Sequence, residues 1–293
     1  MFEPVAQNLV FGILVGALYG LAAVGLSLVF GVLKVLNVAH GELLMLGGYA
    51  SFWLFALYNL DPFLALPLVM LFLFVIGIAL HKGLFIHVVK FTEEIKIKNS
   101  LLIGFGLGLA LHNLAVRLWT ADERSVTTFY SGWAITFFGV RFPIVRLGGL
   151  AIAFFSLLAL HLFLQRTYMG KAIRATAEDW EAATLMGINI HRVYLVSFAL
   201  GSALAGVAGT LVGIGYAIYP AMGLEWTLKA LIVVILAGLG SMMGTFIGGL
   251  ILGVAESASA FLIGGVYREV VSLFIFLLVL TLRPQGLFGE REG

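Results

Sequence analysis

Three polar side chains in the segment Leu36–Ala50, LNVAHGELLMLGGYA, are the first candidates for chemistry, because long apolar runs flank this segment. Asn37, His40 and Glu42 fall within six positions, and each is costly to place in hydrocarbon. Ionisable groups inside a membrane usually face a water-filled route or a partner, and broken helices add polar backbone groups to such a route. The segment is therefore a candidate lining of a transport path. The alternative is a position at the cytoplasmic membrane interface, near Lys34.

The two ionisable groups of this segment point in different directions on a regular helix. With about 3.6 residues per turn, Glu42 lies almost opposite the face that carries Asn37 and Gly41, and His40 lies at the edge of that face. We therefore expect either an interruption of the helix between Asn37 and Gly41 or separate surroundings for His40 and Glu42. Glu256, in LGVAESASAFL, is the other isolated acid in an apolar run and a candidate partner for this segment.

A second polar stretch, Gly170–Val193, has the sequence GKAIRATAEDWEAATLMGINIHRV. Its part Lys171–Met186 contains no Gly or Pro and many helix formers, which predicts one helix of about four turns. Gly187 follows, and glycine is the residue that most often ends a helix in a left-handed conformation. A short helix held between two membrane spans suits docking to a soluble partner, and an ordinary solvated loop is the alternative.

The elements that position these residues are membrane helices. The chain has 293 residues, of which 61% are hydrophobic and 11% are charged, and its mean hydropathy is +1.09; soluble proteins have about 25% charged residues. No segment alternates like a barrel strand, so we predict an all-α, polytopic membrane helix bundle of eight or nine spans. The candidate spans are 8–33, 37–60, 64–81, 99–117, 147–165, 193–217, 227–240, 245–263 and 267–282. They form a single domain, 1–293, with a cytoplasmic loop at 166–192.

Charge and composition limit the function further. Counting alternately from an outer N-terminus places 11 of the 17 Lys and Arg residues inside, which predicts a cytoplasmic C-terminus and a cytoplasmic loop 166–192. The first apolar run has no preceding Lys or Arg, so we expect it to be retained and not cleaved as a signal peptide. A net charge of +2 gives no reason to expect nucleic acid, and the lack of cysteine excludes thiolate chemistry.

Small residues recur every fourth position in three segments, which predicts close helix packing. The three rows are Gly12, Gly16, Gly20; Gly201, Ala205, Gly209, Gly213; and Gly240, Gly244, Gly248.

Two other function classes have weak support. Gly25-Leu26-Ser27-Leu28 matches the GxSx pattern of rhomboid intramembrane proteases, and His112 and His161 lie in later spans, but no second motif and no HExxH metal pair accompanies it. We therefore expect neither an enzyme nor a metal site. An ion-coupled secondary transporter usually has several intramembrane acids, whereas only Glu42 and Glu256 are isolated here.

Several blocks of the sequence resemble one transporter family. Glu181-Ala182-Ala183 followed by Gly187 resembles the EAA loop of ATP-binding-cassette (ABC) importer permeases, although the downstream part of that signature is absent. Four longer blocks resemble the branched-chain amino-acid ABC importer permeases of the LivH/LivM type: NVAHGELLMLGGY, AEDWEAATLMGINIHRVYLVSFALGSALAGVAGTL, VILAGLGSMMGTFIGGLILGVAES and LRPQGLFG. They extend over essentially the whole chain, and the AHG stretch with its following acid is closer to LivH. Urea-importing permeases of the same superfamily look similar.

The resemblance implies roles for two sets of residues. Those at or near the translocation route are Asn37, Ala39, His40, Gly41, Glu42 and Met45, to which we add the isolated Glu256. Those that couple the chain to ATPase subunits are Glu178, Asp179, Trp180, Glu181, Ala182, Gly187 and Ile188.

The resemblance also implies a multi-subunit importer of leucine, isoleucine and valine in the inner membrane. Urea or short amides are the alternative cargo, and a stand-alone secondary transporter is the remote alternative. The implied partners are a second homologous permease, two ATP-binding subunits, an extracytoplasmic solute-binding protein and the lipid bilayer. Because this chain has no GxxxxGK[ST] phosphate loop, we expect ATP and Mg²⁺ on the partner ATPases and no cofactor in this chain.

Overall fold

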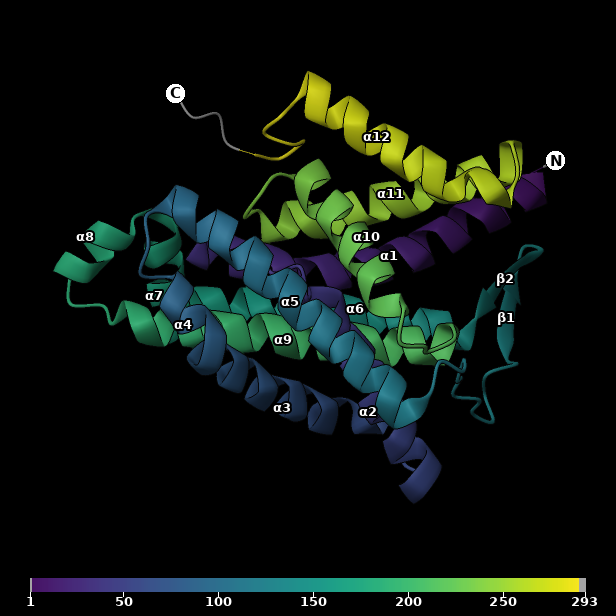
Figure 1. Cartoon of the computed structure of the whole chain (residues 1–293). Coiled ribbons are helices and arrows are strands. Elements are labelled where there is room, and N and C mark those ends of the chain that lie inside the picture. Colours follow the sequence, from purple (N-terminus) through teal and green to yellow (C-terminus); the bar gives the residue numbers. More distant parts are fainter. Residues whose placement is uncertain (1, 290–293) are drawn as a thin grey trace.

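The computed structural model describes residues 2–289. Arg291, one of the 11 basic residues that the charge count places on the cytoplasmic side, is not among the described residues. The described residues form helices joined by loops, the longest of which covers residues 120–133, with one small hairpin (Figure 1). The helices are α1 (Phe2–Leu33), α2 (His40–Tyr58), α3 (Pro62–Leu80), α4 (Ile86–Val88), α5 (Glu93–Trp119), α6 (Ile144–Arg166), α7 (Tyr168–Glu178), α8 (Trp180–Leu185), α9 (Ile190–Gly215), α10 (Met222–Ala237), α11 (Met242–Leu262) and α12 (Arg268–Leu282). A π-helical turn, η1 (His81–Phe85), follows α3, and a 3-10 turn, η2 (Gly265–Tyr267), precedes α12.

The all-α class is confirmed, but the predicted number of spans is too high. Within residues 2–289, seven helices are long and apolar enough to cross a membrane. They cover Glu3–Leu33, Pro62–Val88, Glu94–Trp119, Ile144–Arg166, Ile190–Gly215, Met242–Leu262 and Gly265–Leu282. The predicted segments 37–60 and 227–240 make the difference, because α2 carries His40 and Glu42 in its first turn and α10 has only 16 residues.

Helices α1 and α9 form the centre of the bundle. In their most apolar windows 78% and 83% of the residues are buried, against 11% in α5 and in the last span. A helix that is apolar on all sides must be covered by other helices in a soluble protein, but in a membrane protein lipid can cover the outer ones. The outer helices α3, α5, α6 and α12 therefore expose leucine and phenylalanine side chains towards the surroundings of the bundle.

Two of the three predicted rows of small residues lie at close helix contacts. The row Gly12, Gly16, Gly20 faces α11, where a Cβ atom on Gly16 would lie 2.7 Å from the Gly249 carbonyl oxygen. The row Gly201–Gly213 packs against α1 and α2. The third row is wrong as a helical stripe, because Gly240 lies in the turn before α11 with φ +93°.

The two ends of the bundle differ in structure. At one end lie α7, α8 and the segment that follows α12, and at the other lie the N-terminal end of α1 and the hairpin of β1 (Ala134–Phe137) and β2 (Val140–Pro143) (Figure 1). The hairpin is antiparallel, with Ala134 opposite Pro143. This arrangement agrees with an odd number of crossings.

Candidate functional site

The polar segment contains a break in helical structure between α1 and α2, as one of the two alternatives predicted. Helix α1 ends at Leu33, Lys34 has a left-handed φ of 53°, and α2 begins at His40. Asn37 is 1% exposed, and its Oδ1 accepts a hydrogen bond of 3.1 Å from the backbone N–H of Ala39. Asn side chains stabilise turns in this way because they offer the backbone a partner outside a helix.

His40 and Glu42 have separate surroundings, as the other alternative predicted. The Nε2 atom of His40 lies 2.9 Å from the carbonyl oxygen of Ala22 on α1, so the imidazole joins α2 to the bundle centre. The carboxylate of Glu42 lies instead against Gly223 of α10. These two side chains therefore do not form one ion pair or proton relay.

The start of α2 is held against α10 by a residue that the sequence analysis missed. The Gly41 N–H donates to Thr227 Oγ1 over 2.9 Å, and the same hydroxyl oxygen lies 3.0 Å from the carbonyl oxygen of Val38. A side chain at Gly41 would overlap the backbone of α10. A lone threonine in an apolar helix carries no sequence signal, because only the packing of α2 on α10 reveals its role.

A cavity of about 190 Å³ opens beside Glu42, between α2, α5 and α10. We call it the Glu42 cavity; its lining residues are Val38, Glu42, Phe105, Gly108, Leu109, His112, Ala221 and Leu224. His112 is its other ionisable group, and Nδ1 of this residue lies 3.2 Å from the carbonyl oxygen of Pro220. Ala39 and Met45, also predicted near the route, are fully buried in the helix packing and do not line this cavity.

The prediction that Glu256 pairs with the segment around His40 is wrong. Glu256 is 1% exposed, and its carboxylate accepts hydrogen bonds from Lys229 (2.5 Å), Tyr19 (2.8 Å) and Ser272. These partners belong to α10, α1 and α12, because Glu256 on α11 faces the place where those helices meet. The acid that looked isolated in sequence is therefore half of a buried ion pair.

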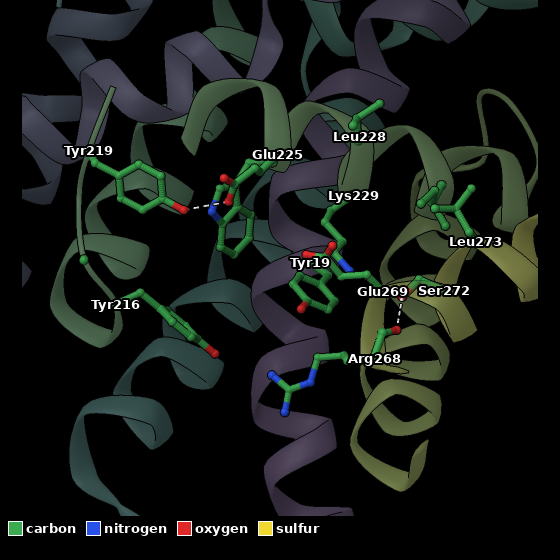
Figure 2. Close-up of a pocket in the computed structure, with 13 residues that line it drawn as sticks. Tyr19, Tyr216, Tyr219, Glu225, Leu228, Lys229, Arg268, Glu269, Ser272 and Leu273 are labelled. Atoms are coloured by element: carbon green, nitrogen blue, oxygen red, sulfur yellow. Dashed lines mark hydrogen bonds between the residues drawn. The ribbon is translucent and has the colours of Figure 1, made fainter. Parts of the chain in front are cut away.

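The ion pair borders a second cavity, of about 350 Å³, between α1, α10 and α12 (Figure 2). Figure 2 shows the Tyr219 hydroxyl directed at Glu225, over 2.6 Å, and the Arg268 side chain extending from α12 towards the tyrosines. Burial and the hydrogen bond to Glu225 raise the pKa of Tyr219 above its ordinary value. The Nε of Arg268 is buried and has no hydrogen-bond partner in the described part of the chain. The sequence analysis missed this cavity because its residues come from distant segments.

The predicted single helix over Lys171–Met186 is wrong, because Asp179 divides it into α7 and α8. Asp179 has an extended backbone, and its Oδ1 accepts hydrogen bonds from the N–H groups of Glu181 (2.9 Å) and Ala182 (3.0 Å). Aspartate favours this N-cap position, where its carboxylate also meets the positive end of the helix dipole. Helix propensity alone did not reveal the break.

The predicted end of this helical segment at Gly187 is confirmed. Gly187 has φ +84°, its N–H donates to the Thr184 carbonyl over 2.9 Å, and the Ile188 N–H donates to the Ala183 carbonyl over 3.1 Å. These two bonds are the pattern of a Schellman motif, which favours glycine at this position. Helix α8 is therefore capped at both ends.

The surface of α7 and α8 carries the predicted coupling residues. Six of them are exposed and Ile188 is half-buried; the exposed six are Glu178, Asp179, Trp180, Glu181, Ala182 and Gly187. Leu185 and Met186 are 88% and 83% exposed, so apolar side chains project from α8. A hollow of about 460 Å³ beside them is lined by Trp180, Thr184 and Ile188 together with residues of the segments 89–96 and 189–194.

The GxSx pattern that suggested an intramembrane protease as an alternative is not accompanied by a histidine partner of Ser27 in the described residues. Ser27 is buried and hydrogen-bonded to Thr245 over 3.0 Å, and His112 contacts Pro220 instead. Among residues 2–289 there is no group of three or more His, Cys, Asp or Glu side chains that could hold a metal ion.

Comparison with known proteins gives one consistent result. Residues 8–280 match the family described as "Branched-chain amino acid transport system / permease component". The chain is 33% identical to the high-affinity branched-chain amino acid transport system permease protein BraD of Pseudomonas aeruginosa and to LivH of Escherichia coli, over 98% of this chain and 96% of each relative. It is 27% identical to LivM of Salmonella typhimurium, over 92% of this chain and 67% of that protein. No solved structure matches the chain.

Proposed function

The chain belongs to the family of branched-chain amino acid transport permease components, and from that premise we propose that it carries leucine, isoleucine and valine across the inner membrane as one subunit of an ABC importer. The observation that carries this proposal is the match to BraD and LivH over nearly the full length of both chains. The multi-pass helix bundle and the exposed, doubly capped α8 support it.

The motor of the importer lies on two separate ATPase subunits, which bind ATP and Mg²⁺ and grip the loop 166–192. Support for this step comes from the exposed coupling residues and from the apolar Trp180, Leu185 and Met186 on α8. A docking helix transmits force only if it is rigid and anchored. Helix α8 is capped at both ends, and α7 packs on α1, α6 and α9, so a push on α8 reaches the centre of the bundle.

The solute passes beside the interruption before α2. Asn37, His40, Gly41 and Glu42 bring polar groups to the start of α2, and the short α10 lies against it. Half-length helices that begin inside a membrane protein direct free N–H groups and polar side chains towards a transported solute. In this proposal Ala39 and Met45 keep α2 in position, and Glu256 acts through its ion pair with Lys229.

Two further protein partners complete the assembly in the lipid bilayer, to which this chain contributes its single permease domain, 1–293. A second, homologous permease forms the other half of the pathway, and the weaker similarity to LivM indicates the kind of chain. The C-terminus is cytoplasmic, because the segment after α12 lies at the same end as α8 (Figure 1). A solute-binding protein then docks at the opposite end, where the hairpin β1–β2 lies.

The experiment that tests the proposal is reconstitution in proteoliposomes. The permease pair with its ATPases should take up radioactive leucine only when the binding protein is outside and ATP is inside. The same vesicles without the ATPases should be inert, even under a proton or sodium gradient. Uptake by this chain alone under such a gradient would support a secondary transporter instead, and uptake of urea but not of leucine would reassign the cargo.

A further inference from the structure

An unpaired carboxylate faces the Glu42 cavity. Glu42 is 5% exposed, and its Oε2 has no hydrogen-bond partner among residues 2–289. The two ion pairs of the described residues are Lys98–Glu94 and Lys229–Glu256, and neither includes Glu42. A buried charge without a partner is strongly unfavourable, so proteins normally supply a cation or several donors. Within the described residues 2–289, neither is found at Glu42.

The space around the carboxylate depends on two glycines. Gly223 on α10 lies directly against it, and a Cβ atom there would overlap the carboxylate oxygens. Gly108 on α5 borders the cavity, where a Cβ atom would lie 3.9 Å from Glu42 Cγ. Gly223 therefore gives the carboxylate its room on one side, and the empty volume lies on the other side, towards α5.

The walls of the cavity are apolar. Val38, Phe105, Leu109, Ala221 and Leu224 form them, around a volume of about 190 Å³. Hydrated metal ions are poorly suited to such walls, because Mg²⁺ or Ca²⁺ needs about six oxygen ligands and Glu42 offers one carboxylate. A primary ammonium on a branched aliphatic chain fits better, since it can donate hydrogen bonds to the Glu42 carboxylate while its hydrocarbon part contacts the walls.

We propose that Glu42 is the subsite that receives the ammonium group of an aliphatic amino acid in transit, with the walls of the Glu42 cavity around its side chain. This inference rests on the proposed function and adds the reason for the cargo: a neutral amide such as urea has no positive charge to pair with Glu42. His112 is the second polar group of the cavity and lies where it can contact the rest of the solute.

The first test uses the complete importer in proteoliposomes, with leucine uptake and ATP hydrolysis measured together. Glu42→Gln removes the charge with little change of shape. It should lower uptake at subsaturating leucine by roughly tenfold or more, the factor associated with a charge-assisted hydrogen bond. Gly108→Leu fills the cavity but keeps the Glu42 carboxylate, and it should lower uptake similarly. Gly106→Leu on the same helix is the matched control, because nothing lies within 4 Å of its Cβ position.

The second test measures binding directly, so that a folding defect is not mistaken for a lost subsite. Purified permease–ATPase complex, with assembly checked by gel filtration, is heated with 3-methylbutylamine or with 4-methylpentanoate. The amine should raise the melting temperature of the wild-type complex but not that of the Glu42→Gln complex, and the acid should raise neither. Equal effects of the two probes, no effect of the amine on the wild type, or normal uptake by Glu42→Gln would overturn the assignment. If the wild-type importer moves no leucine at all, the proposed function fails instead.

Discussion

Replacing one member of the buried ion pair Lys229–Glu256 should destabilise the chain more than replacing both. The Nζ–Oε1 distance is 2.5 Å, and the side chains of Lys229 and Glu256 are 18% and 2% exposed. Glu256→Met leaves the Lys229 ammonium without its ion-pair partner, with the Ser272 hydroxyl 3.3 Å away, and also removes the acceptor of Tyr19 and Ser272. Breaking a buried pair on one side typically costs about 3–5 kcal/mol. The partial exposure of Lys229 to the adjacent cavity favours the lower half of that range.

The opposite single change should be milder. In Lys229→Met the Glu256 carboxyl group keeps its hydrogen bonds from Tyr19 and Ser272. We expect a loss of about 1–3 kcal/mol. In the double variant two methionines of similar length pack together, and replacement of a buried ion pair by apolar residues is often neutral. The coupling energy of the cycle should therefore exceed about 2 kcal/mol.

The measurement is unfolding of the purified chain in detergent, followed by tryptophan fluorescence. Trp226 lies 5.7 Å from the Tyr19 ring, centroid to centroid, so its emission reports on this region. The double-mutant cycle compares the wild type, both single variants and the double variant at fixed detergent concentration. Additive effects, within about 0.5 kcal/mol, or a larger loss in Lys229→Met than in Glu256→Met, would refute the electrostatic reasoning.

Five other substitutions test three remaining features. Gly187→Pro places proline where φ is +84°, which proline cannot adopt, and Glu181→Arg reverses a charge on the exposed face of α8. Each should reduce ATP-driven uptake by roughly tenfold or more, while fractionation shows normal membrane insertion. Normal transport by either variant would show that α8 is not the docking helix. Asn37→Leu and His40→Leu each remove a hydrogen bond at the start of α2, and uptake should fall roughly tenfold while the complex still co-purifies; unchanged uptake would favour a plain interfacial position. Gly16→Val brings a side chain against the α11 backbone, 2.7 Å from its carbonyl oxygen, and should cost about 1–3 kcal/mol in detergent unfolding, whereas a smaller effect would mean that the two helices separate easily.

Local features were predictable from the sequence where a residue type strongly favours one local backbone conformation. Gly187 ends α8 in a left-handed conformation because little else tolerates that backbone, and the interruption near Asn37 follows from an asparagine among polar groups in an apolar chain. The class of fold was predictable for a similar reason, since lipid leaves helices as the only elements for such long apolar runs.

Features that depend on how helices rotate against one another were not predictable. Glu256 and Lys229 are 27 residues apart on different helices, and nothing in either segment indicates that they face each other. The divided helix at Asp179 was missed because its neighbours favour a helix, while the hydrogen bonds of its carboxylate decide the outcome. The predicted spans 37–60 and 227–240 also depended on helix ends that the sequence did not reveal. Helix α2 begins only at His40 and carries Glu42 in its first turn, and α10 has 16 residues, fewer than the about 20 that a spanning helix needs.

The contact between α1 and α11 has a consequence for biosynthesis. Tyr19 and Glu256, which are hydrogen-bonded across this contact, are separated by 237 residues. At typical translation rates of about 5–20 residues per second, α11 is synthesised roughly 10 to 50 seconds after α1. During that time its glycine face is open to other helices in the membrane. Until α11 is made, α1 can pack chiefly on the earlier helices α6, α9 and α10, and its glycine face lacks its final partner.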